Sequence, residues 1–296
     1  MGSNPTVAPL IVVVGETASG KTAASIKIAQ EVGGEIICAD SRTVYQQMDI
    51  GTAKPSIKEQ SGVPHHLLDV VRPDQKFSAS KFQSRAIKCI QEISKRGRVP
   101  IMVGGTGLYI DSVLYNFQFN SKPDEALRTH LEQMNDEELT TLLNTKNIGS
   151  DSLNTKNRRH VIRAIERGGM TPENNTLRAN TLTLGLTLER EVLKERIRLR
   201  VEQMFEDGFL DEVKRLSEEY GWEHESMSGI GYRAVKEYLE GNASLNEVKE
   251  AFFRGDLNLA KRQRTWFKRN KSIVWFDNPE ALIVKAVEFA NSFDYN

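Results

Sequence analysis

The clearest chemistry in the sequence lies at residues 15–22, which read Gly-Glu-Thr-Ala-Ser-Gly-Lys-Thr. Two glycines five residues apart, followed by lysine and threonine, fit the pattern of a phosphate-binding P-loop. In such a loop the backbone N–H groups face one anion, and the N-terminus of the following helix adds positive potential. Lys21 would supply a point charge, and the Thr22 hydroxyl would ligate Mg²⁺. The predicted diphosphate- or nucleotide-binding residues are Gly15, Glu16, Thr17, Ala18, Ser19, Gly20, Lys21 and Thr22.

A carboxylate is expected beside this loop. Asp40 ends the short apolar run 35–39 and lies 18 residues beyond Thr22. Ligands of open α/β sheets bind at the carboxyl ends of the strands, where Asp40 would lie. Taken alone, Asp40 fits a structural role, as a helix cap or as a group that orients the ligands of a bound Mg²⁺, as well as it fits a functional role at the phosphate site. A P-loop indicates pyrophosphate recognition and does not by itself indicate nucleotide hydrolysis.

These residues need a sheet to position them. Apolar runs at 10–14, 35–39 and 99–103 predict buried parallel strands, and residues 22–32 and 78–95 have helical spacing between them. Strand, helix, strand, helix, strand is typical of a parallel sheet with right-handed crossovers. The sequence therefore predicts an α/β fold with a P-loop NTPase-like parallel sheet flanked by helices.

The character of the chain changes after about residue 118. Residues 122–147 are polar, and residues 168–180 are typical of a loop. We expect a core at 1–118 and 181–296 that is interrupted by a small helical insertion at 119–180. After the insertion, the pattern predicts a strand at 181–188 and helices at 189–206, 209–220, 231–240 and 245–270.

Composition limits the function classes. The 296 residues include 40 Lys and Arg against 40 Asp and Glu, which argues against a protein that coats nucleic acid through bulk charge. Two cysteines exclude a disulfide framework and a four-cysteine zinc site, and they suit a reducing compartment. We find neither a membrane-length apolar run nor a signal peptide. We expect a cytoplasmic monomer with no membrane association.

Two segments are nonetheless basic. Residues 156–167 hold five Lys and Arg against one Glu, and residues 254–271 hold seven against one Asp. Arg159 and Arg163 are four residues apart, so they share one helical face. Trp266 and Phe267 interrupt the second segment, a mixture that suits RNA backbone and unstacked bases. A solvated helix face is the ordinary alternative for both segments.

Beyond these patterns, the chain resembles the tRNA dimethylallyltransferases, also called tRNA isopentenyltransferases, in the order and spacing of several motifs. The similarity covers about residues 10–276. The motifs, given by residue range, are Asp-Ser-Arg-Thr-Val-Tyr at 40–45, Asp-Ile-Gly-Thr-Ala-Lys-Pro at 49–55, His-His-Leu-Leu-Asp at 65–69, Gly-Gly-Thr-Gly-Leu-Tyr at 104–109, Gly-Leu-Thr-Leu-Glu-Arg at 185–190, Ile-Gly-Tyr at 230–232 and Ala-Lys-Arg-Gln-Arg-Thr-Trp-Phe at 260–267.

The resemblance implies transfer of a dimethylallyl group from dimethylallyl diphosphate to the exocyclic amine of the adenosine 3′ of the anticodon. The P-loop would then hold the donor's diphosphate, with Lys21 and a Mg²⁺ on Thr22 stabilising the departing pyrophosphate. Asp40 would act as the general base for the attacking amine. The implied catalytic residues are Asp40, Thr22 and Lys21, and the implied partners are dimethylallyl diphosphate and the tRNA anticodon stem-loop.

The resemblance also implies tRNA contacts, position by position. These are Asp40, Ser41, Arg42, Thr43, Thr106, Arg128, Arg159, His160 and Arg163. Three residues depart from the family pattern: Glu16 replaces the usual Pro, Thr43 replaces Gln, and His160 replaces a common Arg. Glu16 would either weaken donor binding or recruit Mg²⁺. Adjacent His65 and His66 lack the spacing of a metal site and are expected to be structural.

Other functions remain open at this point. A related adenylate isopentenyltransferase would transfer the same group to free AMP, ADP or ATP, but it would need neither the insertion nor the basic C-terminal helix. A P-loop small-molecule kinase would consume ATP. A catalytically silent RNA-binding protein would keep its tRNA affinity and would not need Asp40.

Overall fold

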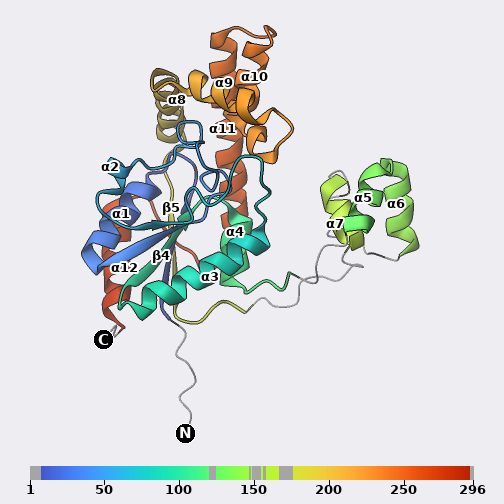
Figure 1. Cartoon of the computed structure of the whole chain (residues 1–296). Coiled ribbons are helices and arrows are strands. Elements are labelled where there is room, and N and C mark those ends of the chain that lie inside the picture. Colours follow the sequence, from blue (N-terminus) through green and yellow to red (C-terminus); the bar gives the residue numbers. More distant parts are fainter. Residues whose placement is uncertain are drawn as a thin grey trace. The chain divides into compact units, whose positions relative to one another are not determined.

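One six-stranded sheet organises the chain, and helices cover both of its faces (Figure 1). The computed structural model describes residues 8–119, 125–146, 148, 155, 158–166 and 176–293. All the strand pairings are parallel, in the order β3-β2-β4-β1-β5-β6. The strands are β1 (Leu10–Gly15), β2 (Gly34–Cys38), β3 (His65–His66), β4 (Val99–Gly104), β5 (Thr181–Leu186) and β6 (Val274–Phe276).

The apolar runs of the sequence form the centre of this sheet. Every residue of β1 and β4 is buried, as expected for parallel strands covered on both faces. The predicted strands at 10–14, 35–39 and 99–103 are confirmed within one residue at each end, and the strand predicted at 181–188 ends at Leu186. This arrangement confirms the predicted α/β fold class.

Two groups of helices enclose the sheet. On one face, α1 (Lys21–Val32) and α12 (Pro279–Asn291) pack together over a core that includes Ile11, Ile101 and Leu184. On the other face, α3 (Ala79–Lys95), α4 (Gly107–Leu114) and α11 (Leu245–Phe267) contact the strands. Ser78 caps α3, because its hydroxyl accepts from the Lys81 N–H.

Two further helices, α8 (Arg190–Glu206) and α10 (Ile230–Leu239), pack along α11. Helix α9 (Phe209–Tyr220) packs against both α8 and α10, and the 3₁₀ turn η1 (Glu225–Ser228) packs against α10. The helix predicted at 189–206 is confirmed as α8, whose apolar stripe of Leu193, Ile197, Val201 and Met204 is buried. A short helix, α2 (Ile57–Gln60), lies on the connection between β2 and β3.

The chain divides into two compact units. The first contains residues 1–114 and 177–296, and the second contains residues 115–176. The second unit holds α5 (Glu125–Gln133), α6 (Asp136–Thr145) and α7 (Arg158–Glu166), with its own apolar core around Leu131, Leu139 and Ile162. In the first unit the two ends of the interruption meet, since the Arg178 N–H donates to the Leu114 carbonyl at 2.7 Å.

No helix among the described residues is both long enough and apolar enough to cross a membrane.

Candidate active site

The P-loop connects β1 to α1 and needs its glycines for two different reasons. At Gly15, a Cβ atom would lie 2.5 Å from the Leu186 carbonyl oxygen, so only glycine fits. Gly20 caps α1 in the left-handed region, with φ 94° and ψ 6°, which side chains other than glycine rarely adopt. The Lys21 ammonium folds back to donate to the Glu16 carbonyl at 3.1 Å. The loop therefore curls around the start of α1, as the sequence pattern predicts.

Lys21 lies in an unusual electrostatic environment. The pKa of its ammonium is lowered from 10.5 to about 8. Burial is the main cause and the charge of Arg200 adds to it, whereas Asp40 and Glu16 oppose the shift. Desolvation penalises the charged form of a lysine, so an anion placed beside it would restore the charge. This arrangement favours binding of a phosphate group at the P-loop.

Two cavities adjoin the P-loop. The first, here called the P-loop cavity, has a volume of about 620 Å³ and includes the apolar side chains of Ile26, Ile36 and Val103 in its wall. The second, here called the α10 cavity, measures about 370 Å³ and reaches the start of α10. The residues that line both cavities are Thr17, Lys21, Asp40, Thr52, Ala53 and Arg200. The two spaces therefore meet at a phosphate-binding lysine and a carboxylate.

The segment after β2 is held in place by backbone contacts. The Asp40 carboxylate accepts from the Arg42 N–H at 2.7 Å, and the Ser41 N–H donates to the Thr106 hydroxyl at 3.0 Å. The Arg42 guanidinium donates to the carbonyls of Glu225 at 2.7 Å and Ser226 at 3.3 Å. The structure thus brings the predicted Asp40, Ser41, Arg42 and Thr106 together at the α10 cavity.

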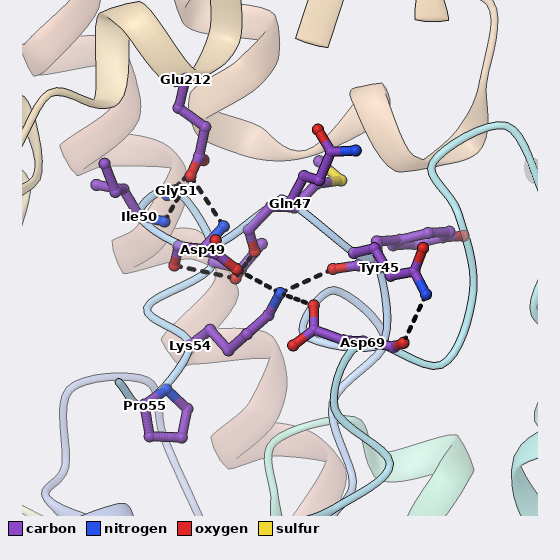
Figure 2. A network of polar contacts seen from close by, with 12 residues as sticks. Tyr45, Gln47, Asp49, Ile50, Gly51, Lys54, Pro55, Asp69 and Glu212 are labelled. Atoms are coloured by element: carbon purple, nitrogen blue, oxygen red, sulfur yellow. Dashed lines mark hydrogen bonds and ion pairs between the residues drawn. The ribbon is translucent and has the colours of Figure 1, made fainter. Parts of the chain in front are cut away.

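The loop that carries the Asp-Ile-Gly-Thr-Ala-Lys-Pro motif borders both cavities through Thr52 and Ala53. The buried Glu212 carboxylate of α9 accepts from the backbone N–H groups of Asp49, Ile50 and Gly51 at 2.8–3.1 Å, and from the Tyr232 hydroxyl at 2.6 Å. Figure 2 shows Glu212 reaching this loop from above. The helices of the first unit therefore fix the shape of both cavities.

Lys54, in the same loop, connects this segment to neighbouring residues. Its ammonium lies 2.6 Å from Asp49 and 2.5 Å from Asp69, and it donates to the Tyr45 carbonyl at 2.8 Å (Figure 2). The Lys54 side chain is only 5% exposed, so these three acceptors replace most of its hydration.

Sequence reasoning missed two arginines on α8. Arg200 lines both cavities and forms an ion pair with the buried Asp256 of α11. One turn earlier, the Arg196 guanidinium approaches Gly20, where a Cβ atom would lie 3.4 Å from its Nη1. The helical spacing could have indicated Arg200, which lies one turn from the buried Ile197, at the edge of the apolar stripe.

Glu16 does not lie as an unpaired charge near the phosphate site. Its side chain is buried and pairs with Arg264 of α11, whose Nε lies 2.6 Å from one oxygen and whose Nη2 donates to the other at 2.9 Å. The expectation that Glu16 weakens donor binding or recruits Mg²⁺ therefore finds no support in this geometry.

The basic and aromatic segment of α11 separates its charged side chains from its packed ones. Phe267 is buried, and the Trp266 indole donates to the Asp111 carboxylate of α4 at 2.8 Å. Lys261 and Arg262 are exposed, so the charged and the packed residues of this segment occupy different faces of the helix.

The second unit holds the other predicted RNA contacts. Arg128 lies 3.5 Å from Glu132 and 3.4 Å from Glu166 within that unit, and Arg163 is exposed. The side chains of Arg159 and His160 lie outside the described part of the structure. In the first unit, His65 and His66 form the edge strand β3, which matches their expected structural role.

Comparison with known proteins places this geometry in a family. The IPP transferase profile matches residues 43–270. A tRNA dimethylallyltransferase of Macrococcus caseolyticus is 42% identical over 294 residues, which cover 95% of this chain and 94% of that protein. The solved tRNA isopentenylpyrophosphate transferase of Bacillus halodurans is 38% identical, with a TM-score of 0.75 and 96% of each chain covered.

A third similarity comes from a eukaryotic dimethylallyltransferase solved while acting on tRNA. It has a TM-score of 0.84 and 26% identity, and the match covers 97% of this chain and 80% of that chain. The family profile spans more than half of the sequence, and the bacterial relatives match nearly all of it. The chain therefore belongs to the tRNA dimethylallyltransferase family of prenyl-transferring enzymes.

Proposed function

We propose that this protein transfers the dimethylallyl group of dimethylallyl diphosphate to the N6 amine of the adenosine 3′ of the anticodon in tRNA. One observation carries the proposal: Lys21 and Asp40 line both cavities. A phosphate-binding group and a proton acceptor therefore lie where two ligands can meet. Positioning of a weakly nucleophilic aromatic amine against an allylic carbon supplies much of the rate in such a transfer.

The donor belongs in the P-loop cavity. Its diphosphate would lie against the P-loop backbone and Lys21, with Arg200 beside them, and its prenyl chain would lie against apolar side chains such as Ile36 and Val103. As the bond between carbon and oxygen breaks, the electron pair stays on the diphosphate. Cations fixed around the P-loop stabilise that charge.

The acceptor adenine belongs in the α10 cavity. The N6 amine forms the new bond to the allylic carbon and loses a proton to the Asp40 carboxylate. One Asp40 oxygen accepts from the Arg42 N–H, which orients the carboxylate. Thr106 lines the α10 cavity, and an adenine that leaves the anticodon-loop stack would meet it there. Thr43 lines the neighbouring P-loop cavity instead.

The residues present fit a Mg²⁺ ion held largely by the donor. In the described part of the chain, no cluster of three or more His, Cys, Asp or Glu side chains could hold a metal alone. Mg²⁺ commonly takes one or two protein oxygens together with substrate phosphates and water, and Thr22 and Asp40, which both line the P-loop cavity, offer such oxygens. The buried hydroxyls of Ser19 and Thr43, which have no described partner, also suit a polar ligand. When bound, the ion neutralises charge on the leaving diphosphate.

The second unit is proposed to hold the anticodon stem-loop. Its α7 carries Arg159, His160 and Arg163, and its α5 carries Arg128. We further propose that the enzyme works as a monomer in the cytoplasm, where tRNA is available.

Mass spectrometry of nucleosides tests the function directly. The protein is incubated with dimethylallyl diphosphate and Mg²⁺, with either unmodified tRNA or AMP as acceptor. We expect a dimethylallyl mass increase on one adenosine of tRNA and none on AMP. Modification of AMP alone would instead indicate an adenylate isopentenyltransferase. In a separate incubation with ATP, consumption of the nucleotide would indicate a kinase.

The Asp40→Ala variant tests the proton acceptor. Loss of a general base typically costs about 10²- to 10⁴-fold in rate, while tRNA affinity should change little. Wild-type activity in this variant would remove Asp40 from the mechanism.

A further inference from the structure

The Gln263 side chain lies buried between two loops that come from different parts of the chain. Its Oε1 accepts from the Thr17 N–H of the P-loop at 2.7 Å. Its Nε2 donates to the Gly105 carbonyl, in the loop after β4, at 3.2 Å. One amide therefore holds both loops, and it uses its acceptor on one and its donor on the other.

Each of these loops lines a cavity in which a ligand is proposed to bind. Thr17 lines both cavities, whereas Gly105 and Thr106 line the α10 cavity. The Thr106 hydroxyl accepts from the Ser41 N–H at 3.0 Å, and Ser41 directly follows Asp40. These hydrogen bonds, together with the peptide bond between Gly105 and Thr106, connect the P-loop through Gln263 to the segment that carries the proposed base.

The loop after β4 has little room to adjust independently. A Cβ atom on Gly105 would lie 2.2 Å from the Gln263 Nε2, and one on Gly104 would lie 2.0 Å from the Ala39 carbonyl oxygen. Close-packed interiors transmit displacements to their neighbours instead of absorbing them. A movement of either loop must therefore move Gln263.

An amide satisfies both hydrogen bonds because it carries an acceptor and a donor at its end. A glutamate at position 263 would place an acceptor against the Gly105 carbonyl, and a lysine would place a donor against the Thr17 N–H. Methionine would fill a similar volume and form neither bond. Gln263 also lines the α10 cavity. The prenyl transfer proposed above gives it no chemical step, and both polar ends of its amide are engaged in the link between the two loops.

We propose that Gln263 couples the P-loop cavity to the α10 cavity, so that diphosphate binding at the first raises tRNA affinity at the second, and the reverse. This inference rests on the proposed function. Each ligand orders the loop that it contacts. Because Gln263 is hydrogen-bonded to both loops, the other loop then becomes more ordered as well, and the second ligand loses less conformational entropy when it binds. By linkage, the two enhancements are equal. Gln263 is thus a positioning residue that acts through Thr17 and Gly105.

The test uses inorganic diphosphate with Mg²⁺ as the donor-site probe, because it carries no allylic group and cannot react. Fluorescence anisotropy gives the Kd of unmodified tRNA with and without saturating diphosphate. We expect diphosphate to tighten tRNA binding about 5- to 10-fold in the wild type, within the usual range of coupling between sites. In Gln263→Met the enhancement should fall below about 2-fold, which a general loss of stability would not produce.

Gln83→Met provides the matched control. Gln83 is equally buried at 8% exposure, and its amide donates to the Ser112 carbonyl at 2.7 Å, between α3 and α4. This variant should keep the wild-type enhancement. Gln263→Glu serves as a second variant, because it keeps an acceptor for Thr17 and loses the donor for Gly105; the enhancement should be lost there too.

The proposal fails if the wild type shows no enhancement, or if either folded Gln263 variant retains it. If neither variant folds, hydrogen exchange in the wild type decides: tRNA alone should slow exchange of a peptide covering residues 15–22, and unchanged exchange would overturn the coupling. A wild type that modifies tRNA without showing coupling refutes this inference alone, whereas one that binds both ligands and modifies no tRNA refutes the proposed function.

Discussion

At the scale of single residues, Lys21 shows how burial tunes a binding group. Its pKa of about 8 means that the ammonium loses its proton just above neutral pH. Donor binding needs the charged form, so kcat/KM for dimethylallyl diphosphate should fall about tenfold per pH unit above pH 8. A pH profile measures this directly.

Two variants control the profile. Lys21→Arg should move the alkaline decline to much higher pH, because a guanidinium stays charged. Lys27→Arg changes another lysine of the same cavity and should leave the decline in place. A profile that stays level from pH 7 to pH 10 would contradict the role given to Lys21.

Asp111 allows a second prediction at this scale. Burial raises its pKa from 3.8 to about 6, although the bond from the Trp266 indole and the charge of Arg269 oppose the shift. The folded pKa of Asp111 exceeds the unfolded one. The stability that its neutral carboxyl group contributes is therefore fully present below about pH 4 and is lost as the pH rises through 6. Asp111→Asn mimics the neutral carboxyl group and still offers Trp266 an acceptor.

Urea unfolding at two pH values tests this prediction. Asp111→Asn should raise the free energy of unfolding by about 1–2 kcal/mol at pH 8 and by much less at pH 4.5. An equal change at both pH values would show that the ionisation of Asp111 does not affect stability.

Individual residues also show where sequence reasoning stops. The P-loop and Asp40 could be predicted because their chemistry depends on residues close together in the chain. The partner of Glu16 could not, since Arg264 lies 248 residues away and only the fold brings the two together. The same is true of Gln263, whose motif suggested RNA binding rather than an internal link.

At the scale of elements, the hydrogen bonds from the loop at residues 49–55 to Glu212 of α9 lead to a prediction. Both Glu212 oxygens accept hydrogen bonds, one from two N–H groups and the other from an N–H and the Tyr232 hydroxyl. In Glu212→Gln, either orientation of the amide turns its NH₂ group toward donors. We expect a loss of about 1–3 kcal/mol in unfolding free energy, and a higher KM for dimethylallyl diphosphate because Thr52 and Ala53 would shift.

Thermal unfolding and steady-state kinetics measure these two effects. Glu218→Gln, on the exposed side of α9, is the control and should change neither. Tyr232→Phe removes only one of the four bonds to Glu212 and should have a smaller effect on both. If Glu212→Gln matched the wild type in stability and KM, the loop would not depend on this carboxylate.

Elements with strong patterns were predictable, and short or terminal ones were not. The four long strands and α8 follow from continuous apolar runs and a clear helical stripe. β3 and β6 are only two and three residues long, too short for any periodicity. α12 was missed although Asn278 and Pro279 form a good helix start. Its apolar face completes the core over α1.

At the scale of the whole molecule, the net charge of zero hides local asymmetry. Because RNA binding releases counterions, tRNA affinity should fall as salt rises, with a logarithmic slope of about −0.7 per phosphate contact. Replacing both Arg159 and Arg163 by Ala should reduce the steepness of that slope by about 1.4 and weaken binding. Titrations at several KCl concentrations provide the slope.

Lys285→Ala is the control for charge alone, because Lys285 lies on α12 and pairs with Glu288 at 3.1 Å. It should leave the slope unchanged. A double arginine variant with the wild-type slope would show that the RNA does not contact α7.

The bond between Arg178 and Leu114 has a consequence for how this chain can vary. Since both ends of the interruption are already joined in the sheet-containing unit, the intervening residues act on the core as a closed loop. The entropy cost of such a loop grows only with the logarithm of its length, about 0.6 kcal/mol for each doubling. This junction is therefore a permissive grafting point, where evolution or an engineer could exchange the recognition module while leaving the catalytic chemistry in place.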